Sequence, residues 1–68
     1  MPIVNIQVTK EGVSDAQKSE LIKRSTEMLQ QVLDKDPATT FVLIQEVEMS
    51  DWGVSGMPVS EYRKLQQA

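Results

Sequence analysis

Apolar and polar residues alternate at the start of the chain, between positions 3 and 9. The apolar positions in this stretch are Ile3, Val4, Ile6 and Val8. A period of two is typical of a strand. Ile3 is an additional apolar residue on the polar side, which indicates that the strand is mostly buried. Pro2 stands at its first residue, where the missing N–H costs little. We therefore predict a strand that begins at Pro2 and ends near Thr9.

The next apolar pattern has the period of a helix. Its members, apolar apart from Ser25, recur three and four residues apart: Leu21, Ile22, Ser25, Met28, Leu29 and Val32. Before them, Ser14 and Gln17 have the spacing of a capping box, in which the serine hydroxyl accepts a backbone N–H and the glutamine side chain reaches back. The pattern stops by Leu33, and Asp36 precedes Pro37, a position biased away from helical dihedrals. The spacing predicts a helix that starts after the serine, followed by an exit loop.

A third pattern, over 39–47, combines β-branched and aromatic residues around a near-continuous apolar centre from Phe41 to Ile44. Such a run is typical of a strand covered on both faces. A strand, an amphipathic helix and a second strand form a βαβ unit, in which the two strands are parallel and the crossover is right-handed. One helix on two strands cannot bury this run by itself, which favours subunits that join their sheets.

The last part of the chain is rich in turn residues. The stretch 51–58 places two glycines and a proline around the single Trp52, which indicates a short hairpin or arm that packs on a neighbour. The tail, 59–68, has weak helical character, and we expect it to fray. The whole pattern predicts one α/β domain over 1–68, a single βαβ unit with a C-terminal hairpin or arm, completed by oligomerisation.

Composition narrows the class of protein. In a chain of 68 residues a single core rarely supplies more than about 3–5 kcal/mol, so a second source of stability is usually needed. The chain has no Cys and no His, which excludes disulfides and a Cys/His zinc site and leaves self-association. The net charge of −3 argues against nucleic acid, and no apolar run approaches the ~20 residues of a membrane span. The N-terminus lacks a charged region followed by an apolar stretch, so we expect a cytoplasmic protein, without metal or cofactor.

Three stretches of the chain together carry a family resemblance. They are PIVNIQV behind the initiator Met, the capped helix start SDAQKSELI, and DPATTFVLIQEV followed by DWGVSG. From Pro2 to about Pro58, the chain resembles the 4-oxalocrotonate tautomerase family. The resemblance implies a tautomerase-like domain, an N-terminal proline that acts as catalytic base once Met1 is removed, and assembly as dimers or as trimers of dimers. We favour the hexamer, because more neighbours cover more of the apolar surface of so small a unit.

The chemistry expected of Pro2 can be argued from its nitrogen. Small residues in second position usually permit removal of the initiator Met, which would leave Pro2 with a free secondary amine. A chain-terminal amine has a pKa of about 8, and an apolar pocket disfavours its charged form and brings the pKa toward neutrality. Such an amine can take a proton next to a carbonyl and return it elsewhere on the conjugated system. If Met1 stays, the nitrogen is an amide with no useful basicity.

Two positions depart from the family's pattern. The resemblance implies an arginine just after the glycine before the helix and another early in the second strand, which hold the carboxylates of a dicarboxylate substrate. Here the first position is Val13, and the second falls at Thr40 or Phe41. The 4-oxalocrotonate substrate is therefore not expected. Of the two arginines present, Arg24 is expected to make a surface pair and Arg63 lies in the poorly specified tail.

Three further residues are candidates for substrate binding. Trp52 matches the position of an aromatic in the wall of the family's site, where it would stack on a conjugated substrate, and it could equally anchor a subunit interface. Lys10 is the cation nearest in sequence to the expected pocket mouth, with simple solvation as the alternative. Thr40 could offer a hydroxyl to a substrate oxygen, although threonine in a strand is ordinary.

The sequence thus favours a tautomerase, an isomerase that uses Pro2 on an enolisable carbonyl compound such as a 2-keto acid or its enol. The two missing arginines favour a monoacid, an aromatic enol or an unrelated carbonyl substrate. Two alternatives remain, a proline-dependent hydratase or decarboxylase of a sister family, and a catalytically inert oligomerising βαβ module.

Overall fold

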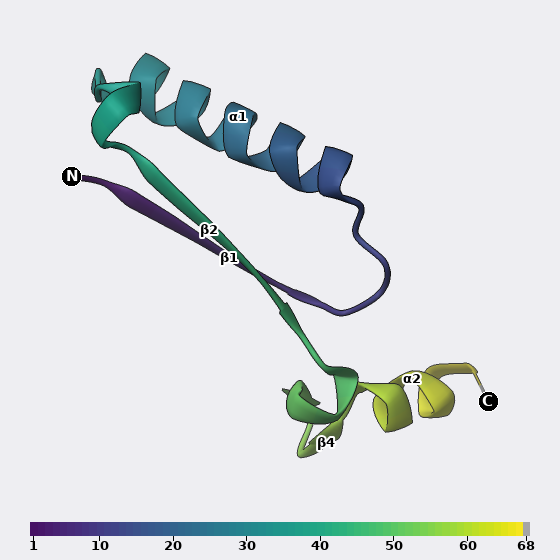
Figure 1. Ribbon diagram of the computed structural model, residues 1–68. Coiled ribbons are helices and arrows are strands. Elements are labelled where there is room, and N and C mark those ends of the chain that lie inside the picture. Colours follow the sequence, from purple (N-terminus) through teal and green to yellow (C-terminus); the bar gives the residue numbers. More distant parts are fainter. Residues whose placement is uncertain (68) are drawn as a thin grey trace.

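The computed structural model describes residues 1–67 (Figure 1). Within these residues the strands are β1 (Ile3–Thr9), β2 (Phe41–Val47), β3 (Gly53–Val54) and β4 (Met57–Pro58), and the α-helices are α1 (Asp15–Leu33) and α2 (Val59–Gln67). Single 3₁₀ turns, η1 (Pro37–Thr39) and η2 (Met49–Asp51), precede and follow β2. Over the same residues, neither helix combines the length and the apolar character of a transmembrane span.

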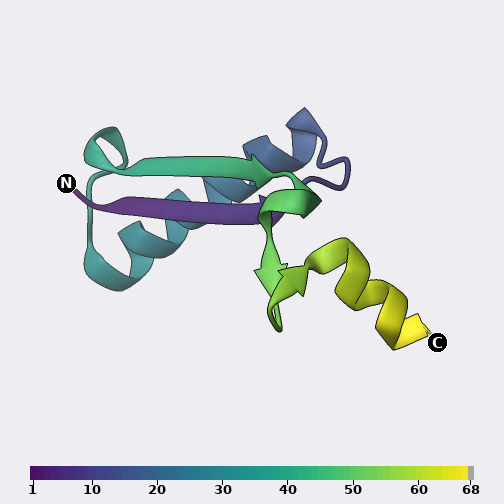
Figure 2. The same ribbon diagram turned by 90° about the horizontal axis from the view of Figure 1, so that it is seen from below.

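β1 and β2 lie side by side and run parallel, with α1 in the connection between them (Figure 1, Figure 2). Their register pairs Ile3 with Phe41 at one end and Thr9 with Val47 at the other. The predicted βαβ unit is confirmed. β2 begins two residues later than the sequence pattern predicts, because the chain first turns through η1.

The N-terminus of α1 carries the predicted capping box. The backbone N–H of Gln17 donates to the Ser14 hydroxyl at 3.1 Å, and the backbone N–H of Ser14 donates to the Gln17 side chain at 2.9 Å. These two donors have no partner inside the helix, so the box satisfies them and fixes the first turn. The helix ends at Leu33, and Asp34 follows in the left-handed region with φ of 55°, which confirms the predicted exit.

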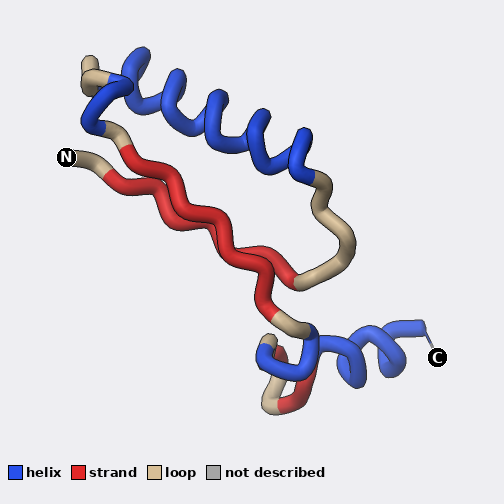
Figure 3. The backbone as a smooth tube through the Cα atoms, in the orientation of Figure 1, coloured by secondary structure: helices blue, strands red, loops and turns tan. Residues whose placement is uncertain are grey.

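α1 covers one face of the β1–β2 sheet and leaves the other face open (Figure 3). The half-buried apolar positions of the covered face are Val4, Ile6, Val8, Val42 and Ile44. On the open face, Ile3, Phe41 and Leu43 are 60%, 49% and 53% exposed. The expectation that the second strand is covered on both faces is therefore not met by one chain. A pair of strands and a single long helix lack the surface to do so.

The C-terminal part begins with the predicted hairpin. β3 and β4 pair antiparallel, with Val54 opposite Met57. The two residues between them, Ser55 and Gly56, have φ of 56° and 82°. Positive φ at both positions is the requirement of the two-residue turn whose twist matches that of a hairpin. The hairpin extends away from the end of β2 (Figure 2).

The tail is helical, as its weak pattern indicates, and forms the nine-residue helix α2. The first turn of this helix is held by contacts with distant parts of the chain. Val59 is 7% exposed, and its N–H donates to the Trp52 carbonyl at 2.8 Å. One turn later, Arg63 pairs with Glu11. Tertiary contacts of this kind stabilise helices too short to form alone. Ala68, the last residue of the predicted tail, lies outside the described residues.

Candidate active site

A cavity of about 380 Å³ lies at the carboxyl end of β1, where α2 approaches the strand. Its lining residues are Gln7, Val8, Thr9, Glu11, Val13, Trp52, Val59 and Arg63. They come from β1, from the loop before α1, from the end of η2 and from the first turns of α2. The volume is at the lower end of the range for small-molecule sites. A single small organic molecule fits this space.

The apolar wall of the cavity joins residues that are far apart in sequence. Val8 comes from β1, Val13 from the next loop, and Trp52 and Val59 from the C-terminal part. The hydrogen bond from the Val59 N–H to the Trp52 carbonyl holds the start of α2 against the tryptophan backbone. An indole ring among valines offers a flat apolar surface on which a conjugated molecule can stack.

The polar side of the cavity is an ion pair. Arg63 donates from both terminal nitrogens to the two carboxylate oxygens of Glu11, at 2.5 and 3.3 Å, and the Thr9 hydroxyl donates to the same carboxylate. These hydrogen bonds, that from Arg63 above all, lower the pKa of Glu11 to about 2. The carboxylate in turn raises the pKa of the Arg63 guanidinium. Because each partner favours the charged form of the other, the pair stays ionised at neutral pH.

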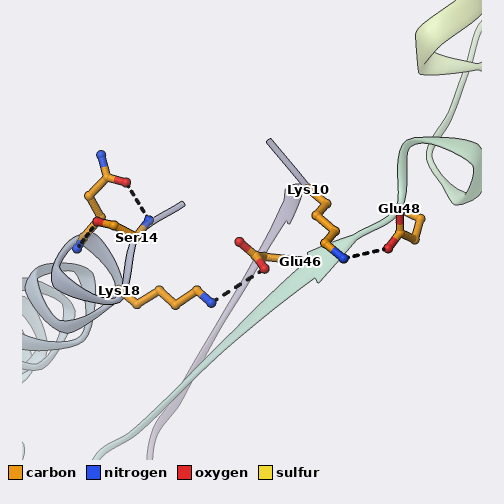
Figure 4. Close-up of polar contacts among 6 residues, drawn as sticks. Lys10, Ser14, Lys18, Glu46 and Glu48 are labelled. Carbon is orange, nitrogen blue, oxygen red and sulfur yellow. Dashed lines mark hydrogen bonds and ion pairs between the residues drawn. The ribbon is translucent and has the colours of Figure 1, made fainter. Parts of the chain in front are cut away.

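Lys10, a predicted substrate contact, lies just beyond the end of β1. Its ammonium pairs with Glu48 at 3.1 Å, and on the neighbouring part of the sheet Lys18 of α1 pairs with Glu46 at 3.6 Å (Figure 4). The Lys10 N–H donates to the Val47 carbonyl at 2.8 Å and extends the ladder by one residue. The structure thus places the ammonium in an exposed ion pair, outside the set of residues that line the cavity.

Pro2 and Thr40 lie at the opposite end of the sheet. The Phe41 N–H donates to the Pro2 carbonyl at 3.0 Å, so the register sets Pro2 beside Thr40. The Thr40 hydroxyl donates to the Asp36 carbonyl at 2.9 Å. β1 has seven residues, which span about 23 Å at the usual rise of a strand. Within one chain, Pro2 therefore lies roughly 17 Å from Gln7, the first cavity residue along β1, and farther from Thr9.

Sequence patterns point to Trp52 but give no role to Glu11 and Arg63, which the structure adds to the same cavity. A signal for the arginine does exist in the sequence. Val59 and Arg63 are four residues apart and therefore share one face of a helix. A helix that buries the valine against the tryptophan backbone also places the arginine over the cavity.

The protein is thus a small βαβ chain with a proline before β1 and, at the end of that strand, a cavity of small-molecule size lined by Trp52. The family model described as "Tautomerase enzyme" matches residues 2–62. The chain belongs to this tautomerase family, as the sequence resemblance predicts.

Individual proteins show the same relationship. Probable tautomerase K2 of Dickeya dadantii (strain 3937) is 50% identical over 64 residues, which cover 94% of this chain and 96% of the relative. The crystal structure of DmpI from Helicobacter pylori matches with a TM-score of 0.86 at 32% identity, over 93% of this chain and 97% of that one. A heterohexamer 4-oxalocrotonate tautomerase from Chloroflexus aurantiacus J-10-fl gives a TM-score of 0.80 at 30% identity, over 90% and 97% of the two chains.

Proposed function

We propose that the protein is a tautomerase that moves a proton on an enolisable carbonyl compound, with the free amine of Pro2 as general base and acid. The observation that carries the proposal is the family match, which begins at Pro2 itself. Met1, which must be removed to free this nitrogen, is 86% exposed. An exposed first residue is accessible to the peptidase that removes it, which supports the proposal.

For the enol of a 2-keto acid, the proton transfer balances with Pro2 alone. The unprotonated amine takes the proton of the enol hydroxyl, and the C–O bond becomes a carbonyl as the electron pair of the C=C bond moves to carbon. The protonated amine then delivers its proton to that carbon. The amine returns to its starting form, and no electron is exchanged with a cofactor.

Assembly is part of the proposal, because one chain keeps Pro2 and the Trp52 cavity at opposite ends of β1. Two strands related by a two-fold axis can run antiparallel, so that the start of one lies beside the end of the other. A second copy placed in this way would bring its own Pro2 to the carboxyl end of the first copy's β1. The open sheet face, with Phe41 and Leu43, supplies apolar area for further copies. We propose a homo-oligomer whose sites are shared between copies, a hexamer in preference to a dimer.

The proposed substrate is a small carbonyl compound, in a cytoplasmic protein that acts on neither nucleic acid nor membranes. In this site Trp52 provides the wall on which the substrate stacks. Thr40 lies beside Pro2, and its hydroxyl, which donates to Asp36, keeps the capacity to accept a hydrogen bond. Lys10 reaches a substrate only after its ammonium leaves Glu48.

Pro2→Ala tests the role of the proline. Alanine in second position also permits removal of Met1, so the variant keeps a free amine but loses the ring that fixes the direction of the nitrogen. We expect kcat/KM for the ketonisation of phenylenolpyruvate to fall by about 10²–10⁴, the usual contribution of a general base. Pro37→Ala, the same change made in η1, is the matched control and should stay near the wild-type rate. If Pro2→Ala keeps that rate, the proline mechanism is wrong.

A further inference from the structure

The cavity contains one arginine, Arg63, which comes from α2. Val13, from the loop before α1, lines the same cavity and carries no charge. The chain has two arginines, and Arg24, the other, lies on α1 and lines a different cavity.

Arg63 already holds a carboxylate in this cavity, that of Glu11. Its two terminal nitrogens donate to the two oxygens at 2.5 and 3.3 Å, and a donor pair of this kind is how arginine recognises a carboxylate. The side chains of Arg63 and Glu11 are 43% and 42% exposed. Since solvent reaches both partners, the pair can exchange with a carboxylate from solution.

The surroundings of the ion pair restrict the kind of acid that fits. One guanidinium recognises one carboxylate, so a monoacid is favoured over a diacid. Trp52 and the valines that line the same cavity favour a flat, conjugated body. A cavity of about 380 Å³ admits one small molecule of this shape.

We propose that Arg63 binds the carboxylate of a small planar monocarboxylic acid, and that Glu11 is the internal carboxylate which this acid displaces. That the acid is the substrate rests on the proposed function, whereas its binding does not. The exchange is balanced in charge, because one carboxylate leaves the guanidinium as another arrives. Because the Glu11 carboxylate competes for Arg63, an anion that binds Arg63 only weakly does not displace it.

The Arg63–Glu11 pair has a second conceivable role, which is to hold α2 on the sheet without contacting any ligand. The two roles predict opposite results when Glu11 loses its charge. If the carboxylate competes with a ligand, its removal tightens binding. If the pair serves only as an attachment for α2, its removal loosens the cavity wall and weakens binding.

Binding can be read directly, because Trp52 is the single tryptophan of the chain and lies in the cavity wall. We would titrate the full-length protein with cinnamate, a planar monoacid without an enolisable hydrogen, and with its neutral amide, cinnamamide, and follow tryptophan fluorescence. For the wild type we expect cinnamate to bind about tenfold more tightly than the amide, the size of a charge-assisted hydrogen bond.

Three variants decide between the roles. In Arg63→Gln, the preference for cinnamate over cinnamamide should disappear. In Glu11→Gln, which keeps the size of the side chain, cinnamate should bind several-fold more tightly than in the wild type. The matched control is Arg24→Gln. Its predicted surface pair with Glu20 is confirmed at 2.6 Å, and it lines a neighbouring cavity of about 360 Å³, so this variant should bind like the wild type.

The proposal is overturned if Glu11→Gln binds cinnamate no more tightly than the wild type, or if Arg63→Gln keeps the preference for cinnamate over cinnamamide. A misfolded Glu11→Gln variant cannot produce the expected result, because an unfolded protein does not bind cinnamate more tightly. Cinnamate binding involves no proton transfer, so its result does not depend on the turnover of Pro2→Ala. Failure of the proline mechanism and failure of the Arg63 site are therefore separate results.

Discussion

At the scale of single residues, one ion pair controls the charge of the cavity. Arg63, with help from the Thr9 hydroxyl, lowers the pKa of Glu11 from 4.5 to about 2. A carboxylate whose pKa is lower in the folded chain than in the unfolded one stabilises the folded chain above its unfolded pKa. This contribution is present at neutral pH and is lost as the pH falls from 4.5 toward 2.

Glu11→Gln should therefore be less stable than the wild type near neutral pH, and the difference should shrink through the same acidic range. The measurement is the free energy of unfolding by urea at a series of pH values and at one fixed protein concentration, because assembly makes stability depend on concentration. Arg24→Gln leaves the Glu11 pair intact, so the pH dependence of this control should match that of the wild type. A difference between Glu11→Gln and the wild type that is the same at every pH contradicts the assigned cause.

At the scale of elements, the β1–β2 sheet has two unequal faces. Strand alternation sends one set of residues toward α1 and the other set outward. The outward set includes Ile3, Phe41 and Leu43, each about half exposed or more. Apolar side chains grouped on one face in this way are typical of an interface between proteins. We propose that this face forms contacts between copies of the chain.

Leu43→Glu tests that assignment. It places a charge in the middle of the proposed interface, where an unpaired carboxylate costs several kcal/mol. The mass of the assembly, measured by sedimentation, should fall toward that of a single chain. Lys35→Glu, a charge change in the loop after α1, is the control and should leave the mass unchanged. An assembly that keeps its full mass with Leu43→Glu has its interface elsewhere.

Elements differ in how far the sequence predicts them. α1 and the two long strands follow from strong periodicities, and Ser14 and Asp36 mark the ends of the helix region through cap and loop chemistry. The β3–β4 hairpin follows from turn residues. The sequence does not predict the full length of α2. Its nine residues form a helix mainly because Val59 is buried and because Arg63 pairs with Glu11, 52 positions away in the chain. Local periodicity gives this tail only weak helical character and does not show which distant residues it contacts.

At the scale of the whole molecule, one chain is too extended to enclose a hydrophobic core of its own. Its radius of gyration is 15.6 Å, whereas a compact chain of this length has about 11 Å. Chain length and the lack of Cys and His predict self-association. Which ends of the chain meet in the assembly cannot be predicted in this way, because contacts between copies are absent from local patterns. The structure adds that Pro2 and the cavity lie at opposite ends of β1.

The proposed chemistry requires that the nitrogen of Pro2 is a free amine, which the intact mass of the untagged protein, expressed in a bacterial cytosol, reports. We expect a mass that is short by one methionine residue. That result would allow the amine to be titrated and keto–enol substrates to be compared. A mass that includes Met1 would place an amide at position 2 and contradict the proposed chemistry.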